Sequence, residues 1–135
     1  MTQEDKEQLL KDLCARLPYG VKVKLGDNPN IFDLEYRIKF AAMDGDSDKL
    51  EDILDITNIK PYLFPMSSMT EEQKREYNSL RDFVPTYHYE YGDIVEDTEL
   101  YDNWGSIDYL IANHFDYRGL IEEGLALDAT GKNIY

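Results

Sequence analysis

The sequence predicts an α+β fold: a small antiparallel sheet of about three to four strands, covered by an N-terminal helix and a second helix, with short C-terminal helices. Apolar residues in the first segment recur at helical spacing, and apolar and charged residues alternate from residue 21 onward. No repeat, low-complexity tract or linker divides the 135 residues, of which 42% are hydrophobic. We therefore expect one domain, 1–135, with one core.

Two longer helices are predicted from their start signals. The first begins at Thr2, which can form a capping pair with Asp5 and is followed by an apolar stripe that ends before Pro18. Cys14 lies in that stripe and is expected to be a small core side chain rather than a reactive thiol. The second helix is expected over 70–84, where TEEQ forms a capping box at Thr70.

Strands are predicted where apolar and polar residues alternate with a period of two. The clearest runs are 21–25 and 32–40, with the aspartates and glycine of 44–48 forming the turn that follows. Residues 50–57 suit either a helix or a strand, and a third strand is favoured because a lone hairpin is only marginally stable. The run 86–91 alternates as an additional strand would, whereas 92–103 has the composition of an acidic loop.

The remaining segments are shorter. Pro61 and Pro65 make 59–68 an extended connector. A short helix is expected from Ser106 and another over 118–124, and the tail that follows is expected to be extended.

Charge and cysteine content exclude several classes of protein. The chain has 28 acidic and 14 basic residues, a net charge of −14, which argues against direct nucleic-acid binding because phosphate neutralisation needs a basic patch. Neither a membrane span nor a secretory signal is visible. The single cysteine cannot form an internal disulfide, which favours a reducing cytoplasm.

No motif implies a cofactor, and no recognisable nucleophile or phosphate-binding pattern is present, so catalysis is not favoured.

The charge is concentrated in one stretch, residues 82–117. It contains nine acidic residues and nine of the 17 aromatic residues, and no Lys or Arg lies between Arg81 and Arg118. Tyrosines surrounded by acidic residues suit the binding of a protein partner, and the acidic residues favour a basic one. The candidate partner-binding residues are Tyr87, Tyr89, Glu90, Tyr91, Asp93, Glu96, Asp97, Glu99, Tyr101 and Trp104. Two alternatives stay open: a solvated segment with tyrosines in the core, and a DNA mimic that inhibits a host defence or DNA-binding protein.

Two weaker patterns could bind metal. His114 and Asp116, together with the distant His88, could form the site of a metal-dependent hydrolase, although a structural turn explains the pair more simply. Asp44, Asp46 and Asp48, followed by Asp52 and Asp55, have the spacing of a calcium loop. Lys49 stands where that loop needs glycine, so a solvated turn is favoured.

Two blocks resemble a known group of sequences. IKPYLFPMSSMTEEQKREY (59–77) and IDYLIANHFDYRGLIEEGLALDATGKNIY (107–135) resemble an uncharacterised family of small proteins encoded in prophages and mobile elements of gut bacteria. The commoner form of that family has a histidine pair where this chain has Asn113-His114. The resemblance implies an origin in a mobile element but no activity.

Overall fold

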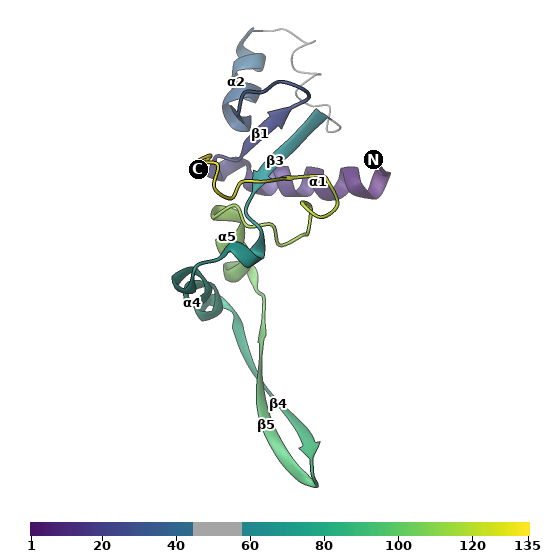
Figure 1. Ribbon diagram of the computed structural model, residues 1–135, viewed down its shortest axis with the longest axis vertical. Helices are drawn as coiled ribbons and strands as arrows, with labels where there is room; N and C mark the ends of the chain where they lie inside the picture. The colour runs from purple at the N-terminus through teal and green to yellow at the C-terminus, as the bar shows by residue number, and fades with distance from the viewer. Residues whose placement is uncertain (45–57) are drawn as a thin grey trace. The chain divides into compact units, whose positions relative to one another are not determined.

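The computed structural model describes residues 1–44 and 58–135, which form two compact units (Figure 1). The first unit comprises Met1–Ser68 and Ile111–Tyr135, and the second comprises Met69–Leu110. Within the described residues the fold is α+β, with four α-helices, a four-stranded mixed sheet and a β-hairpin. The predicted fold class is confirmed. The predicted third strand at 50–57 and the calcium-loop residues from Asp46 onward lie outside the described residues.

Helix α1 (Gln3–Arg16) begins where the sequence predicts. The Thr2 hydroxyl accepts a hydrogen bond from the Asp5 amide at 3.1 Å, and the Asp5 carboxylate accepts one from the Thr2 amide at the same distance. The helix then passes into a short 3-10 helix, η1 (Leu17–Tyr19), which contains the expected Pro18.

The buried face of α1 differs from the predicted stripe. Leu9 and Leu13 are buried as expected, but Cys14 is exposed, so its predicted core position is wrong. Asp12 and Arg16 are buried instead, with the Asp12 carboxylate 2.8 Å from Arg16 Nε. Arg16 Nη2 also donates to the Phe115 carbonyl at 2.5 Å, and Arg118 Nε lies 3.4 Å from Asp12 Oδ1. Because opposite charges surround each other here, this charged pair can occupy a buried face of the helix where the spacing predicts apolar residues.

The sheet of the first unit has the order β2-β1-β3-β6. Strand β1 (Lys22–Leu25) pairs antiparallel with β2 (Phe32–Asp33) and with β3 (Ile59–Leu63), whereas β6 (Leu127–Asp128) runs parallel to β3. One face of this sheet joins α1 in a core that contains Leu9, Leu13, Val21, Val23, Ile59, Leu63, Leu120 and Leu125. The strand predicted at 21–25 and the extended start of the tail are confirmed. The extended connector predicted over 59–68 is confirmed for β3 but not for its end, where Met66–Ser68 form a 3-10 helix, η3.

The strand predicted over 32–40 is wrong, because α2 (Leu34–Asp44) follows directly after the two residues of β2. The Asp33 carboxylate accepts a hydrogen bond from the Tyr36 amide at 2.9 Å and so caps the new helix. Leu34 and Ile38 pack on the core while Tyr36 is exposed. Residues 34 and 38 fit a helical spacing of four as well as an alternation of two, and the helix uses the former.

The second unit begins with α4 (Glu71–Leu80), which has the predicted capping box at Thr70. The helix ends four residues before the predicted end. Strand β4 (Asp82–Glu90) follows, and it pairs antiparallel with β5 (Asp93–Tyr101). The loop predicted over 92–103 is therefore wrong for most of its length. The strand predicted at 86–91 is confirmed as far as Glu90, and Tyr91 lies in the turn instead.

Helix α5 (Trp104–Ala112) confirms the short helix predicted from Ser106. The helix predicted over 118–124 is wrong, since these residues form turns in which Gly119 and Gly124 have positive φ angles of 74° and 75°. A positive φ at both positions leaves only the four residues between them for a right-handed turn, which is too few for a helix of several turns. No helix in the described part of the chain is long and apolar enough to cross a membrane.

Candidate functional site

The β4–β5 hairpin contains nine of the ten predicted partner-binding residues. Its strands pair at every position from Asp82 opposite Tyr101 to Glu90 opposite Asp93. Tyr91 and Gly92 connect them with positive φ angles of 52° and 84°. Positive φ at both central residues is typical of a type I′ turn, which suits the twist of a two-residue hairpin.

The register divides the hairpin into two unlike faces. Residues directly opposite each other in an antiparallel pair share a face, and successive residues alternate between faces. One face, here called the aromatic face, holds Phe83, Pro85, Tyr87 and Tyr89 with Ile94, Glu96, Thr98 and Leu100. The other, here called the acidic face, holds Asp82, Val84, Thr86, His88 and Glu90 with Asp93, Val95, Asp97, Glu99 and Tyr101.

The aromatic face is open to solvent. The exposed fractions of Phe83, Tyr87, Tyr89 and Ile94 are 69%, 66%, 79% and 66%. A two-stranded sheet with neither face covered buries little apolar surface, so these side chains gain little from folding. Contiguous exposed apolar side chains on a protein surface are typical of a binding site. The alternative that placed these tyrosines in a core is wrong for Tyr87, Tyr89 and Tyr91.

Two of the ten predicted residues lie outside the paired strands. Tyr91 occupies the turn and is 99% exposed, and Trp104 begins α5 and is 88% exposed. Phe83, Ile94 and Leu100 belong to the same aromatic face but were not among the predicted residues. The alternation of 87 and 89 extends back through Pro85 to Phe83, and following it past the proline would have identified that residue.

The base of the hairpin is fastened to α4 by hydrogen bonds within the second unit. The Arg81 guanidinium donates to the Leu100 carbonyl at 2.8 Å and lies 5.1 Å from the centre of the Tyr77 ring. The Tyr77 hydroxyl donates to the Asp102 carboxylate, and burial together with that carboxylate raises the pKa of Tyr77 to about 12. The Asn103 side chain donates to the carbonyl of Leu80 at 2.8 Å. These contacts hold the base, and nearly all residues of the two strands stay exposed.

No protein-family model, curated protein or solved structure matches this chain. The function of this chain is therefore inferred from the chemistry of its own residues.

His114 and Asp116, the predicted metal-binding pair, have structural roles in the first unit. The two Asp116 carboxylate oxygens each accept a backbone hydrogen bond at 2.9 Å, from Leu120 and from Ile121. The His114 ring stacks on Tyr135 with 3.7 Å between ring centres. Within the described ranges no three His, Cys, Asp or Glu side chains are grouped as metal ligands. Both Asp116 carboxylate oxygens are thus occupied by backbone amides, as in the structural turn that the sequence favoured for this pair.

Proposed function

We propose that this chain is a non-enzymatic accessory protein of a phage or other mobile element, and that its β4–β5 hairpin binds a protein partner. The aromatic face supports this proposal, because it exposes three aromatic rings and an isoleucine side by side on paired strands. Tyrosine is common among residues that dominate binding energy, since its ring buries a large area while its hydroxyl can stay hydrated. The resemblance of 59–77 and 107–135 to prophage proteins supports the proposed origin.

The acidic face supports a basic partner. Asp82, Glu90, Asp93, Asp97 and Glu99 lie on it, and the second unit holds eleven acidic and three basic residues. Such a field speeds encounter with a positively charged surface and disfavours acidic ones. The aromatic face would then supply most of the affinity, and the acidic face would supply steering and selectivity.

The test is capture of a protein from host lysate by immobilised wild-type chain and by variants matched in stability. Tyr87→Thr combined with Tyr89→Thr removes two rings but keeps residues that favour strands. Tyr36→Thr is the control, because Tyr36 is 65% exposed on α2 of the other unit. We expect one protein to be retained by the wild type and by the control, and its affinity for the double variant to fall at least 30-fold, since a dominant interface residue contributes about 2 kcal/mol.

Salt and charge variants separate this proposal from a DNA mimic. Asp93→Asn with Asp97→Asn should slow association at about 50 mM NaCl and have little effect at about 300 mM. A mimic would behave differently: the charge variants would abolish binding, the tyrosine variants would not, and affinity would fall steeply with salt. That result, or the absence of any retained protein at low salt, would contradict the proposal.

A further inference from the structure

A second charged feature lies in the first unit, on the face of the sheet that points away from the core. In the pairing of β1 with β3, Val23 lies opposite Pro61 and Leu25 opposite Ile59, and these positions are on the core side. Lys24 lies directly opposite Lys60 between them, so both lysines point to the other face.

This pair of lysines costs free energy unless something compensates it. Like charges placed directly opposite each other destabilise an antiparallel pair. The chain has twice as many acidic as basic residues, yet neither Lys24 nor Lys60 forms an ion pair with any residue in the described ranges. Lys22, on the same strand, does pair, with Asp33 at 3.2 Å. The two unpaired ammonium groups are therefore a local positive site on an acidic protein.

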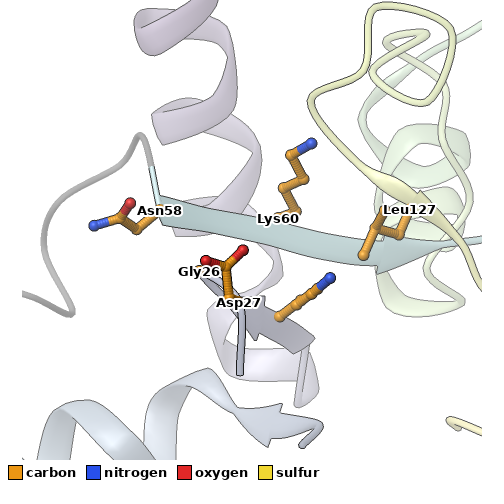
Figure 2. A pocket seen from close by; sticks show the side chains of 6 residues that line it. Gly26, Asp27, Asn58, Lys60 and Leu127 are labelled. Carbon is orange, nitrogen blue, oxygen red and sulfur yellow. The ribbon is translucent and has the colours of Figure 1, made fainter. Parts of the chain in front are cut away.

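Both lysines line one pocket of about 250 Å³. Figure 2 shows Lys60 with Gly26, Asp27, Asn58 and Leu127 around it. Its other lining residues are Gly26 and Asp27 from the turn after β1, Asn58 just before β3, and Leu127 on β6. The Gly26 amide donates to the Asn58 carbonyl at 2.8 Å, and Gly26 has a positive φ of 53°. This hydrogen bond fixes the backbone on the side of the pocket formed by Gly26 and Asn58. Pockets for drug-sized ligands are mostly larger, so this one suits a small group.

We propose that this pocket binds a phosphoryl group, held between the ammonium groups of Lys24 and Lys60. Two point charges match a dianion, and lysine is a common phosphate ligand, whereas planar carboxylates are recognised more often by the fork of arginine. The Asp27 carboxylate at the same pocket repels an anion and therefore lowers the affinity. The ligand is either free phosphate or a phosphate monoester on a small molecule.

The experiment follows backbone amide shifts of the full chain as inorganic phosphate is added, with chloride adjusted to keep the ionic strength constant. Saturable shifts are expected at Gly26, Asn58 and Lys60. Lys60→Gln should weaken binding about tenfold, because it removes one charge-assisted contact. Lys74→Gln, which removes an exposed lysine from α4 of the other unit, is the matched control and should change nothing.

Asp27→Asn gives the sharper test, because it should strengthen phosphate binding several-fold by removing a like charge without removing a ligand. Shifts that never saturate, or that are unchanged in Lys60→Gln and in Asp27→Asn, would overturn the site. A parallel titration with phenyl phosphate distinguishes the two sources: tighter binding than phosphate indicates a monoester, and equal or weaker binding indicates the free ion. Capture of a protein by the hairpin is independent of either result.

Discussion

At the scale of single residues, His114 shows how the fold fixes a protonation state. Its carbonyl accepts a hydrogen bond from the Phe64 amide at 2.8 Å, and its ring stacks on Tyr135. Tyr135 is anchored in turn, since its hydroxyl donates to the Tyr62 carbonyl at 2.6 Å and accepts from the Lys22 amide at 2.9 Å. Burial, with the positive charges of Arg16 and Lys22, lowers the pKa of His114 from 6.5 to about 4. The imidazole is therefore neutral at neutral pH.

That shift predicts a specific dependence of stability on pH. The unfolded chain takes up a proton on this histidine near pH 6.5, and the folded chain does so only near pH 4. The contribution of His114 is therefore complete above pH 6.5 and is lost as the pH falls from there toward 4. Between pH 7 and pH 4.5 the expected loss is about 2 kcal/mol of unfolding free energy. Urea unfolding at the two pH values, with NMR titration of the ring, measures both quantities.

His114→Asn is the control for this prediction. His114 has a positive φ of 63°, and asparagine tolerates that backbone conformation better than most residues. The variant should lose the stacking on Tyr135 and be less stable at pH 7, but it should lack the extra 2 kcal/mol loss at pH 4.5. A ring that titrates near 6.5 in the folded wild type would contradict the assigned environment.

At the scale of elements, the hairpin turn has a residue that suits its position poorly. Tyr91 has φ 52°, a left-handed conformation that costs an L-residue with a bulky side chain about 1 kcal/mol. Tyr91→Asn gives the Asn-Gly sequence that type I′ turns favour, and because Tyr91 is 99% exposed it should lose no contact. We expect amide hydrogen exchange in β4 and β5 to slow about threefold.

Tyr91→Val is the matched opposite change. A β-branched residue is strained further at positive φ, so exchange in the same strands should accelerate. If both substitutions leave exchange unchanged, the turn does not limit opening of the hairpin. If Tyr91→Asn also reduces capture of the partner, the ring at the turn is part of the binding surface.

The elements also show where sequence patterns are sufficient. Both capping boxes, at Thr2 and Thr70, are local hydrogen-bond patterns and were predicted correctly. Strand β5 was missed because it belongs to a ribbon with two wet faces, so burial imposes no alternation of apolar and polar residues. Pro85 directly follows the helix predicted over 70–84, but it lies within β4 instead. Both strands of a two-stranded sheet are edges, where proline is tolerated.

The candidate site was predictable in composition but not in arrangement. The tyrosines and acids of 82–117 stand out in the sequence, but their separation onto two faces depends on the register between β4 and β5. A shift of one residue would exchange the faces of one strand relative to the other. The Lys24–Lys60 pair depends likewise on pairing between segments 36 positions apart, which no local pattern reveals.

At the scale of the whole molecule, the net charge of −14 is unevenly divided. The 42 residues of the second unit carry −8, and the 93 residues of the first carry −6. Opposite positions in the hairpin include Glu90 with Asp93, a pair of like charges that destabilises the strands it joins. Self-repulsion in this chain is therefore concentrated in the hairpin that we propose as the binding surface.

Added salt should therefore stabilise the protein, and the hairpin acids should account for much of the effect. Raising NaCl from about 10 to about 150 mM shortens the Debye length from about 30 to about 8 Å, which screens repulsion between exposed acids. We expect the thermal midpoint to rise by several degrees. Asp93→Asn with Asp97→Asn should reduce this salt-dependent rise in the thermal midpoint more than Glu122→Gln with Glu123→Gln, which removes the same charge from exposed turns of the first unit.

An equal reduction by the two variants would mean that total charge, and not its concentration in the hairpin, sets the repulsion. A midpoint that falls with salt would mean that ion pairs such as Lys22–Asp33 contribute more than the repulsion does.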